Sequence, residues 1–216
     1  NDGNIAAYGT AALTGKTCIA ATLGTSLGGG VSVLEGSEAE IYEYLSYISR
    51  VIKDPHSKRQ HRSTGVFGPY GMYISQRGWI VNAQERGFVF NEKNDERTML
   101  GELLKAVKES NPIVLESLND IASDFIEMIE KVRYVFTGKG IQTVSAMGKV
   151  TEAEAGKKFK EFAGQILQEH SLNDIELVFP MEDEYLRMIF ADYVRMEKGE
   201  NIGSDALEAD VSKLIP

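Results

Sequence analysis

A cluster of glycine, lysine and hydroxyl residues near the start of the chain has the composition of a phosphate-binding loop. Glycines allow backbone N–H groups to face a phosphate, lysine neutralises its charge, and a threonine hydroxyl can bind Mg²⁺. We therefore predict nucleotide binding by Gly9, Thr14, Gly15, Lys16 and Thr17, with Thr17 also on the metal. Five residues separate the two glycines, whereas the usual motif has four, so this motif contains an insertion.

A carboxylate at the end of a buried strand would complete a site for Mg²⁺ and a nucleoside triphosphate. Glu116 follows the apolar run 113–115 and is the candidate for this metal-binding role, although an aspartate is usual there. The same residues also fit one long helix over 112–135 that begins at Pro112, on which Glu116 would face solvent. Periodicity alone leaves both interpretations open.

The segments around these residues predict alternating strands and helices. A phosphate loop needs a strand before it and a helix after it, and residues 4–8 and 18–27 are interpreted in this way. Further strands are expected at residues 31–34, 66–74, 79–83, 88–90, 141–147 and 175–179. Further helices are expected at residues 38–53, 94–109, 119–135 and from 151 to about 169, with capping boxes at Ser37/Glu40 and Thr151/Glu154. This order is typical of an α/β fold with a mostly parallel central sheet.

Length and composition limit the classes of protein that this chain can represent. It has 216 residues, of which 43% are hydrophobic and 25% charged, as in a single globular domain. The net charge of −9 argues against a surface built for nucleic acid, and the single Cys18 excludes an intramolecular disulfide. No apolar stretch is long enough to cross a membrane, so we expect a cytoplasmic protein. The chain does not start with methionine, and a missing N-terminal segment stays an open alternative.

Residues 53–62 form a polar, basic segment that includes Lys53, Lys58, Arg59 and Arg62. Such a segment is usually a solvated loop, but it could also dock an acidic partner.

Taken together, the segments resemble the KaiC-like branch of the RecA superfamily of P-loop ATPases, most closely the archaellum accessory ATPases (FlaH/ArlH). NIAAYGTAALTGKTCIAATLG resembles the first strand, phosphate loop and helix of that family, and NPIVLESLNDIA resembles its Walker B strand. VSVLEGSEAEIYEYL and GKGIQTVSAM are similar to its second strand and its sensor strand. Residues 53–92 do not follow the family and are interpreted as a divergent loop or hairpin insertion.

This resemblance implies a three-layer RecA-like fold over residues 1–216 that binds ATP and Mg²⁺. It makes Glu38 the base or water-positioning carboxylate, with Glu35 as the alternative, Glu116 the Walker B acid and Ser145 the polar residue at the tip of the sensor strand. It also implies a regulatory or assembly ATPase with weak or absent hydrolysis, forming a homo-oligomeric ring with a protein partner in an archaellum or pilus motor. The alternatives are a catalytically decayed P-loop fold that serves as a structural subunit, and a MinD/ParA-like ATPase.

Overall fold

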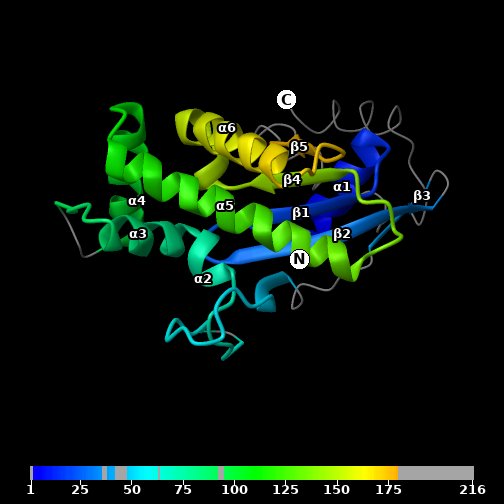
Figure 1. The fold of residues 1–216 in the computed structure, drawn as a ribbon, viewed down its shortest axis with the longest axis horizontal. Helices are drawn as coiled ribbons and strands as arrows, with labels where there is room; N and C mark the ends of the chain where they lie inside the picture. Colours follow the sequence, from blue (N-terminus) through cyan, green and yellow to red (C-terminus); the bar gives the residue numbers. More distant parts are fainter. Residues whose placement is uncertain (1, 36–37, 42–47, 63, 92–94, 180–216) are drawn as a thin grey trace, which may run out of the picture.

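The molecule is built on one mixed five-stranded sheet (Figure 1). The computed structural model describes residues 2–35, 38–41, 48–62, 64–91 and 95–179. The strand order is β3-β2-β1-β4-β5. The strands are β1 (Cys18–Leu23), β2 (Leu27–Glu35), β3 (Glu38–Ile41), β4 (Thr143–Met147) and β5 (Glu176–Val178). β1 pairs with β2 and β2 with β3 in antiparallel register, whereas β1–β4 and β4–β5 are parallel. The expectation of a RecA-like, mostly parallel sheet is therefore wrong.

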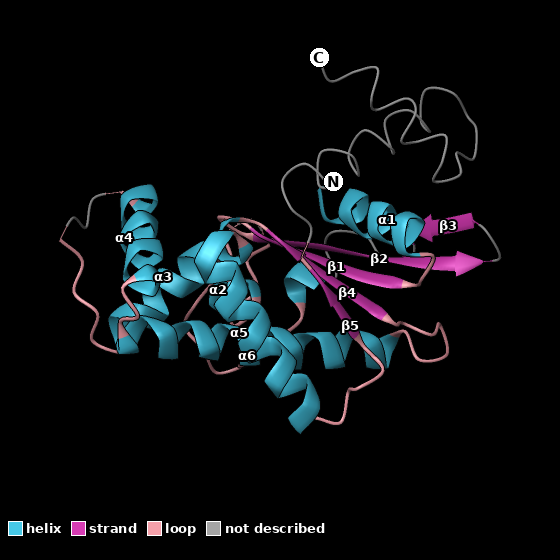
Figure 2. Cartoon of the chain, turned by 90° about the horizontal axis from the view of Figure 1, so that it is seen from above, coloured by secondary structure: helices cyan, strands magenta, loops and turns pink. Residues whose placement is uncertain are grey.

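Helices cover both faces of this sheet (Figure 2). One face carries α1 (Asp2–Thr14), and the opposite face carries α5 (Pro112–Val135) and α6 (Ala153–Glu169). Three further helices, α2 (Gly71–Ile74), α3 (Gln76–Glu85) and α4 (Glu96–Lys108), pack beside α5 and α6. Two short 3₁₀ turns, η1 (Ile48–Arg50) and η2 (Lys149–Thr151), connect elements.

Alternation along β1 divides the interior into two unequal cores. Ile19, Ala21 and Leu23 belong to the large core that α5 and α6 complete, which also contains Phe125 and Phe159. Cys18 and Ala20 belong to a small core with residues of α1, mostly alanines. Because successive strand residues face opposite sides and both sides are covered, β1 is apolar except for Thr22, and it shows no polar period from which a strand could be recognised.

The small core exists because α1 packs directly on the backbone of β2. An atom in the Cβ position of Gly30 would lie 2.6 Å from Oδ1 of Asn4 and 2.8 Å from the carbonyl oxygen of Gly3. Gly3 packs in the same way against the backbone of Gly29. Glycine is therefore required where the helix and the strand touch.

The first part of the chain reverses the order that the sequence predicted. Residues 4–8, expected to be a strand, lie in α1, and residues 18–23, expected to be helical, form β1. The strand–loop–helix arrangement of a P-loop is consequently absent from this segment, which runs helix–loop–strand. Short apolar runs rich in alanine carry no period that separates a buried helix from a buried strand, which is the physical reason for the error.

Several other expectations also fail in the middle of the chain. Residues 38–41 form β3 instead of a helix, while Ser37 and residues 42–47 lie outside the described residues. The strands expected at 66–74 and 79–83 are wrong, because α2 and α3 occupy most of these residues, and 88–90 form no strand. The strand expected at 31–34 is confirmed as part of β2.

Two amphipathic helices and the last two described strands were predicted correctly. α4 confirms the helix at 94–109, α6 confirms the helix from 151 to 169, and β4 and β5 confirm the last two described strands. At Pro112 the long-helix interpretation is the correct one, since α5 runs unbroken to Val135 with Asn111 as its N-cap. The Thr151 capping box does not form, because the Thr151 hydroxyl donates to the carbonyl of Gly148. Within the described residues, no helix is long and apolar enough to cross a membrane.

The close contact between α1 and β2 should contribute to the stability of the folded protein. Gly30→Ala should lower the free energy of unfolding by about 1–3 kcal/mol, because the backbones of Gly3 and Asn4 would have to move apart from β2. Gly101→Ala in α4 is the control: its Cβ meets nothing within 4 Å, and it should stabilise the helix by about 0.5–1 kcal/mol. Urea denaturation of both variants measures the difference, and equal behaviour would contradict the close packing.

Candidate functional site

The turn between β1 and β2 lies where two parallel strands end. β1 ends at Leu23 and its parallel neighbour β4 ends at Met147, so the turns that follow them share one edge of the sheet. An atom at the Cβ position of Gly148 would lie 2.6 Å from the carbonyl oxygen of Leu23, which shows that the two turns touch. Gly148 has φ = 110°, a conformation that favours glycine. Ligands of open α/β sheets bind at the carboxyl ends of the parallel strands, so this edge is the candidate site.

The β1–β2 hairpin supplies a glycine-rich backbone and hydroxyl groups at this edge. Its sequence over residues 23–30 is LGTSLGGG, and Thr25 and Ser26 are exposed at the tip. The carbonyl of Gly24 accepts a hydrogen bond from the backbone N–H of Gln76 at 2.9 Å, which fixes the first turn of α3 against the hairpin. The first turn of α1 lies on the same hairpin at Gly29 and Gly30. The positive ends of two helix dipoles therefore face the hairpin and favour an anion there.

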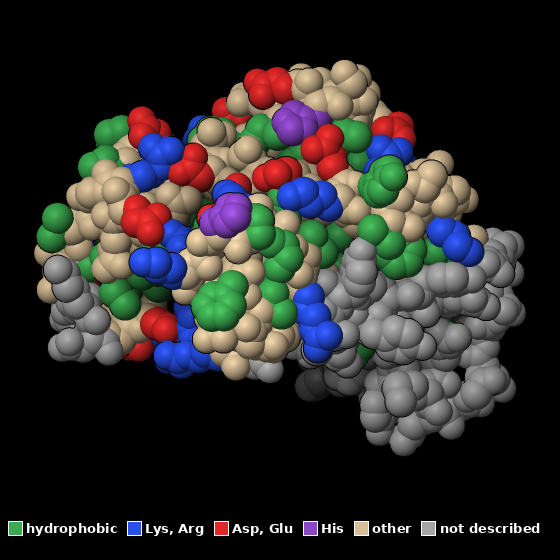
Figure 3. Space-filling view, turned by 60° about the horizontal axis from the view of Figure 1, so that its bottom comes forward, with side chains coloured by type: hydrophobic (Ala, Val, Ile, Leu, Met, Phe, Trp, Pro, Cys, Tyr) green, Lys and Arg blue, Asp and Glu red, His purple; other side chains and the backbone are tan. Residues whose placement is uncertain are grey.

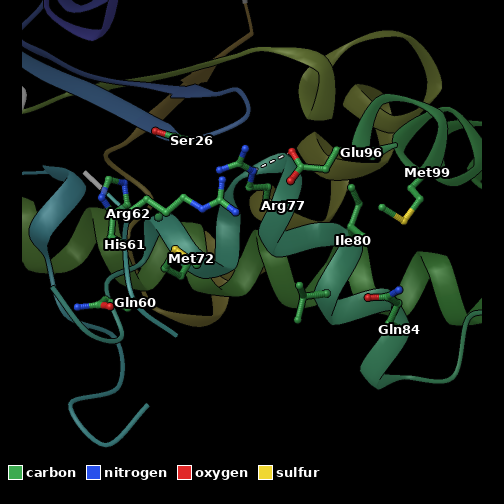
Figure 4. Close-up of a pocket in the computed structure, with 12 residues that line it drawn as sticks. Ser26, Gln60, His61, Arg62, Met72, Arg77, Ile80, Gln84, Glu96 and Met99 are labelled. Carbon is green, nitrogen blue, oxygen red and sulfur yellow. Dashed lines mark hydrogen bonds and ion pairs between the residues drawn. The ribbon is translucent and has the colours of Figure 1, made fainter. Parts of the chain in front are cut away.

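A pocket of about 340 Å³ opens beside the hairpin tip (Figure 4). This volume is in the range of small-molecule sites. The walls come from the hairpin, the segment at residues 60–62, and the helices α2, α3 and α4. The lining residues are Ser26, Gln60, His61, Arg62, Gly71, Met72, Arg77, Ile80, Val81, Gln84, Glu96 and Met99.

Two guanidinium groups give the pocket a positive character. Figure 4 shows Arg62 and Arg77 directed into the same space near Ser26. Arg77 is paired with Glu96 at 2.8 Å, whereas Arg62 is exposed and has no ion-pair partner in the described part of the chain. Two arginines with one carboxylate leave a net positive charge, and arginine is suited to bidentate binding of phosphate or carboxylate groups.

His61 closes one wall of the pocket as a buried and oriented side chain. It is 8% exposed, and its Nδ1 accepts a hydrogen bond from the backbone N–H of Thr64 at 3.3 Å. A neutral imidazole whose Nδ1 accepts carries its proton on Nε2. His61 can therefore donate from Nε2.

The predicted phosphate loop lies at the opposite edge of the sheet. Gly15 ends α1 in a left-handed conformation with φ = 63°, and its N–H bonds to the carbonyl of Ala11, as in a helix C-cap. Lys16 forms an ion pair with Glu176 at 2.7 Å, at the start of β5. The Thr17 hydroxyl accepts from the N–H of Leu34. The prediction that these residues form a P-loop is therefore wrong. Their roles in nucleotide binding stay predictions that no longer have this geometry to support them.

Gly9 and Thr14 are part of α1, away from any loop. Gly9 is buried in the helix, and the Thr14 hydroxyl donates to the carbonyl of Thr10 at 2.7 Å. The five residues of the predicted phosphate site are thus split between a helix, its C-cap and the entry to β1.

The predicted acidic and sensor residues are not brought together either. Glu116 lies on the exposed side of α5, paired with Arg86 at 2.8 Å, so the Walker B strand expected at this position is wrong. The hydrogen bonds that Arg86 donates to the carboxylate of Asp120, together with the negative charges of Asp120 and Glu116, raise the pKa of Arg86. Glu35 and Glu38 are register partners at the ends of β2 and β3. Ser145 is buried in the middle of β4 rather than at its tip, and its hydroxyl is unpaired among the described groups.

Cys18 takes no part in chemistry. It is fully buried beneath α1, and burial raises the pKa of its thiol to about 12. A thiol that stays protonated is a poor nucleophile.

Sequence reasoning missed the hairpin that carries the site. Its signal was present in the run Gly28–Gly29–Gly30, which directly follows residues 18–27 that we interpreted as a helix. A glycine run beside alternating apolar residues also marks a strand that another backbone approaches closely, and this is what the structure contains.

Comparisons with known proteins identify the fold of the chain. No protein-family model matches the chain, and no curated protein matches it in sequence. The glucokinase of the ROK family from Streptomyces griseus, solved with glucose and AMPPNP, is similar with a TM-score of 0.69 and 18% identity over 91% of this chain and 67% of that chain. The ROK hexokinase from Thermus thermophilus is similar with a TM-score of 0.63 and 18% identity, covering 92% of this chain and 65% of that chain.

Two further solved structures extend the comparison. A putative N-acetylmannosamine kinase from Listeria monocytogenes has a TM-score of 0.62 at 13% identity, covering 92% of this chain and 65% of that one. A ROK-family transcriptional regulator, a homologue of the E. coli MLC protein, has a TM-score of 0.61 at 16% identity, covering 86% of this chain and 48% of that one. The chain thus spans at most about two thirds of the length of these structures. It has the actin-like fold of ROK proteins and not a RecA-like fold, and the resemblance to KaiC-like ATPases is wrong.

Proposed function

We propose that this chain acts as an ATP-dependent sugar kinase, which transfers a phosphoryl group from ATP to a sugar hydroxyl. The observation that carries the proposal is the fold likeness to the Streptomyces griseus glucokinase solved with glucose and AMPPNP, an ATP analogue. This replaces the archaellum or pilus ATPase function, which depended on the RecA resemblance. The ring and the motor partner lose their support with it. ATP and Mg²⁺ remain the cofactors, and a cytoplasmic location remains a prediction.

The hairpin and the pocket supply groups suited to a nucleoside triphosphate. The backbone at Gly24 and the hydroxyls of Thr25 and Ser26 are at the edge that two helix N-termini make favourable for phosphates. Arg62 and Arg77 offer charge-assisted hydrogen bonds to phosphate oxygens.

A Mg²⁺ ion would be bound largely through the triphosphate. The described residues contain no group of three His, Cys, Asp or Glu side chains that could hold a metal. This fits Mg²⁺, which keeps several waters and commonly binds substrate phosphates with only one or two protein carboxylates. When bound, the ion would neutralise charge that develops on the transferred phosphoryl group.

Phosphoryl transfer also requires a group that accepts the proton of the attacking hydroxyl. Asp2 is the first residue of α1 and immediately precedes Gly3, which packs on Gly29 of the hairpin. The sequence therefore places an aspartate beside the glycine-rich strand. We assign it the role of general base for the sugar hydroxyl.

Sugar-dependent regulation without catalysis is the second candidate function. The likeness to the ROK-family transcriptional regulator favours it, at a TM-score close to those of the kinases. The two functions differ in one measurement, because only the kinase forms a sugar phosphate from ATP.

The first prediction for this function concerns Asp2. With ATP, Mg²⁺ and a panel of hexoses including glucose, the wild type should form ADP and a hexose phosphate, and Asp2→Asn should lower kcat by about 10²–10⁴-fold, the usual contribution of a general base. AMPPNP affinity should be unchanged, and the control Asp120→Asn on α5 should retain activity. Sugar binding without phosphate transfer by the wild type would instead support the regulator.

The second prediction concerns the charge of the pocket. Arg77→Gln should raise the Kd for AMPPNP about tenfold, equivalent to about 1.4 kcal/mol, because a charge-assisted hydrogen bond to phosphate is lost. Arg97→Gln, on the exposed surface of α4, makes the same change of charge outside the pocket and should have little effect. Calorimetric titration measures both, and equal affinities of the two variants would exclude the pocket as the phosphate site.

The third prediction separates the two proposed phosphate sites. Lys16 lies before β1 and the hairpin tip lies after it, so the six residues of the strand place the two about 20 Å apart. Lys16→Ala should leave AMPPNP affinity unchanged and alter stability by less than about 1 kcal/mol, since its ion pair with Glu176 is exposed. A tenfold loss of affinity would restore the predicted role of Lys16.

A further inference from the structure

A loop held by polar contacts forms one wall of the pocket. We name residues 51–69 the pocket loop; residue 63 within it lies outside the described part. Its two ends are joined, since Ile52 bridges to Pro69 and the N–H of Lys53 donates to the carbonyl of Gly68 at 2.9 Å. Its arms are also joined to each other, by hydrogen bonds from Gly68 to Arg59 and from His61 to Val66. The loop is therefore a closed unit, and it should move as one body.

The outer end of this unit reaches the pocket. Gln60, His61 and Arg62 all line it, and the Arg62 side chain extends toward Arg77 of α3 (Figure 4). The width of the pocket, and the separation of its two arginines, therefore depend on where the loop sits relative to α3. Two guanidinium groups bind one anion with high affinity only if both can contact it at the same time.

A nearly buried ion pair anchors the base of the loop. Lys53 contacts the carboxylate of Asp124 on α5, and the exposed fraction of the Asp124 side chain is only 9%. Burial raises the pKa of Asp124, and the hydrogen bond and charge of Lys53 oppose this shift. Removing two charges from water is costly, so a pair of this kind contributes little net stability, and its best-attested use is to fix a register.

The same anchor reaches the helices on the other side of the pocket through Tyr73. The Lys53 ammonium lies 4.7 Å and the Arg59 guanidinium 4.5 Å from the centre of the Tyr73 ring. Arg59 also pairs with Glu85 of α3 at 2.6 Å, and Tyr73 bonds to the Ser57 hydroxyl at 2.8 Å. The loop is thus connected to α2, α3 and α5 by charged and aromatic contacts. Figure 3 shows basic and acidic side chains interspersed over this face.

We propose that the Lys53–Asp124 pair is a positioning device for the pocket, which fixes the pocket loop against α5 and thereby sets the place of His61 and Arg62 opposite α3. The pair touches no ligand and acts only through the loop. The position of the loop is independent of the proposed kinase function, whereas the consequence for nucleotide affinity rests on it.

Spin-label distances test the position of the loop without any ligand. Labels are attached to Lys58→Cys in the loop and Lys105→Cys in α4, both exposed; the native Cys18 is fully buried and should not react. In Asp124→Asn the side chain keeps its shape but loses its charge. The distribution of distances should become about twofold broader, because the loop is released to its own local fluctuations.

A matched variant on the same helix controls for general destabilisation. Arg133→Met removes the ion pair between Arg133 and Asp174, which does not reach the pocket. The Arg133 side chain is 28% exposed and the Lys53 side chain 29%, so the basic partners of the two pairs are matched in exposure. It should leave the distances unchanged. Lys53→Arg, which retains the charge, should keep the narrow distribution even if Asp124→Asn folds poorly. An unchanged distribution in Asp124→Asn, or equal broadening in Arg133→Met, would overturn the proposal.

AMPPNP titration adds the functional consequence. Asp124→Asn should raise the Kd about fivefold or more, within the range of coupling between sites, while Arg133→Met should match the wild type. If the wild type itself binds no AMPPNP, the proposed kinase function fails, and the distance measurement still decides whether the pair positions the loop.

Discussion

Contact between the backbone of α1 and the backbone of β2 is the constraint on which the arrangement of this site depends. Glycines at the points of contact allow the helix to lie directly on the strand, where any side chain would separate them. The small core beneath α1 consists largely of alanine as a result. The first turn of the helix, with Asp2 and the positive end of its dipole, is thereby held at the hairpin.

The antiparallel hairpin and the parallel pairing of β1 with β4 form the edge at which we propose an anion site, and this site differs in kind from the one that the sequence suggested. In a P-loop, one glycine-rich loop connects a strand directly to the helix whose N-terminus binds phosphate. Here the glycine-rich turn connects two strands, and the helix N-termini come from α1 and α3, at separate places in the chain. The glycine-rich turn and the helix N-termini are brought together by the tertiary structure, so they do not form a contiguous sequence motif.

This difference explains which parts could be predicted from the sequence. The helices α4 and α6 each have a solvent-facing side, and their polar residues reveal the period of 3.6. Residues 4–8 and 18–23 are covered on both sides, and their apolar composition has no period to read. The tripeptide Gly15–Lys16–Thr17 then decided the interpretation, although each residue has a local structural role: a helix C-cap, an exposed ion pair and a hydroxyl that accepts from a neighbouring strand. The basic segment at 53–62 was recognised as a loop, but its part in a pocket depended on α3, which had been taken for a strand.

The negative net charge of the chain makes the two arginines of the pocket important for the binding of any anion. A net charge of −9 disfavours the approach of an anion such as a nucleoside triphosphate, so any site for one has to reverse the potential locally. The fold does this by bringing Arg62 from the pocket loop to Arg77 from α3. Glu96 pairs with Arg77, so among the described residues the unpaired positive charge of the pocket lies on Arg62 of the exposed pocket loop, and apolar packing alone would let this loop move away. The ion pair between Lys53 and Asp124, with Arg59 and Tyr73 beside it, resists that movement because hydrogen-bonded charges hold a fixed relative geometry. An apolar contact at this place would stabilise the fold equally well but would not fix the position of the loop, which explains the presence of a buried ion pair.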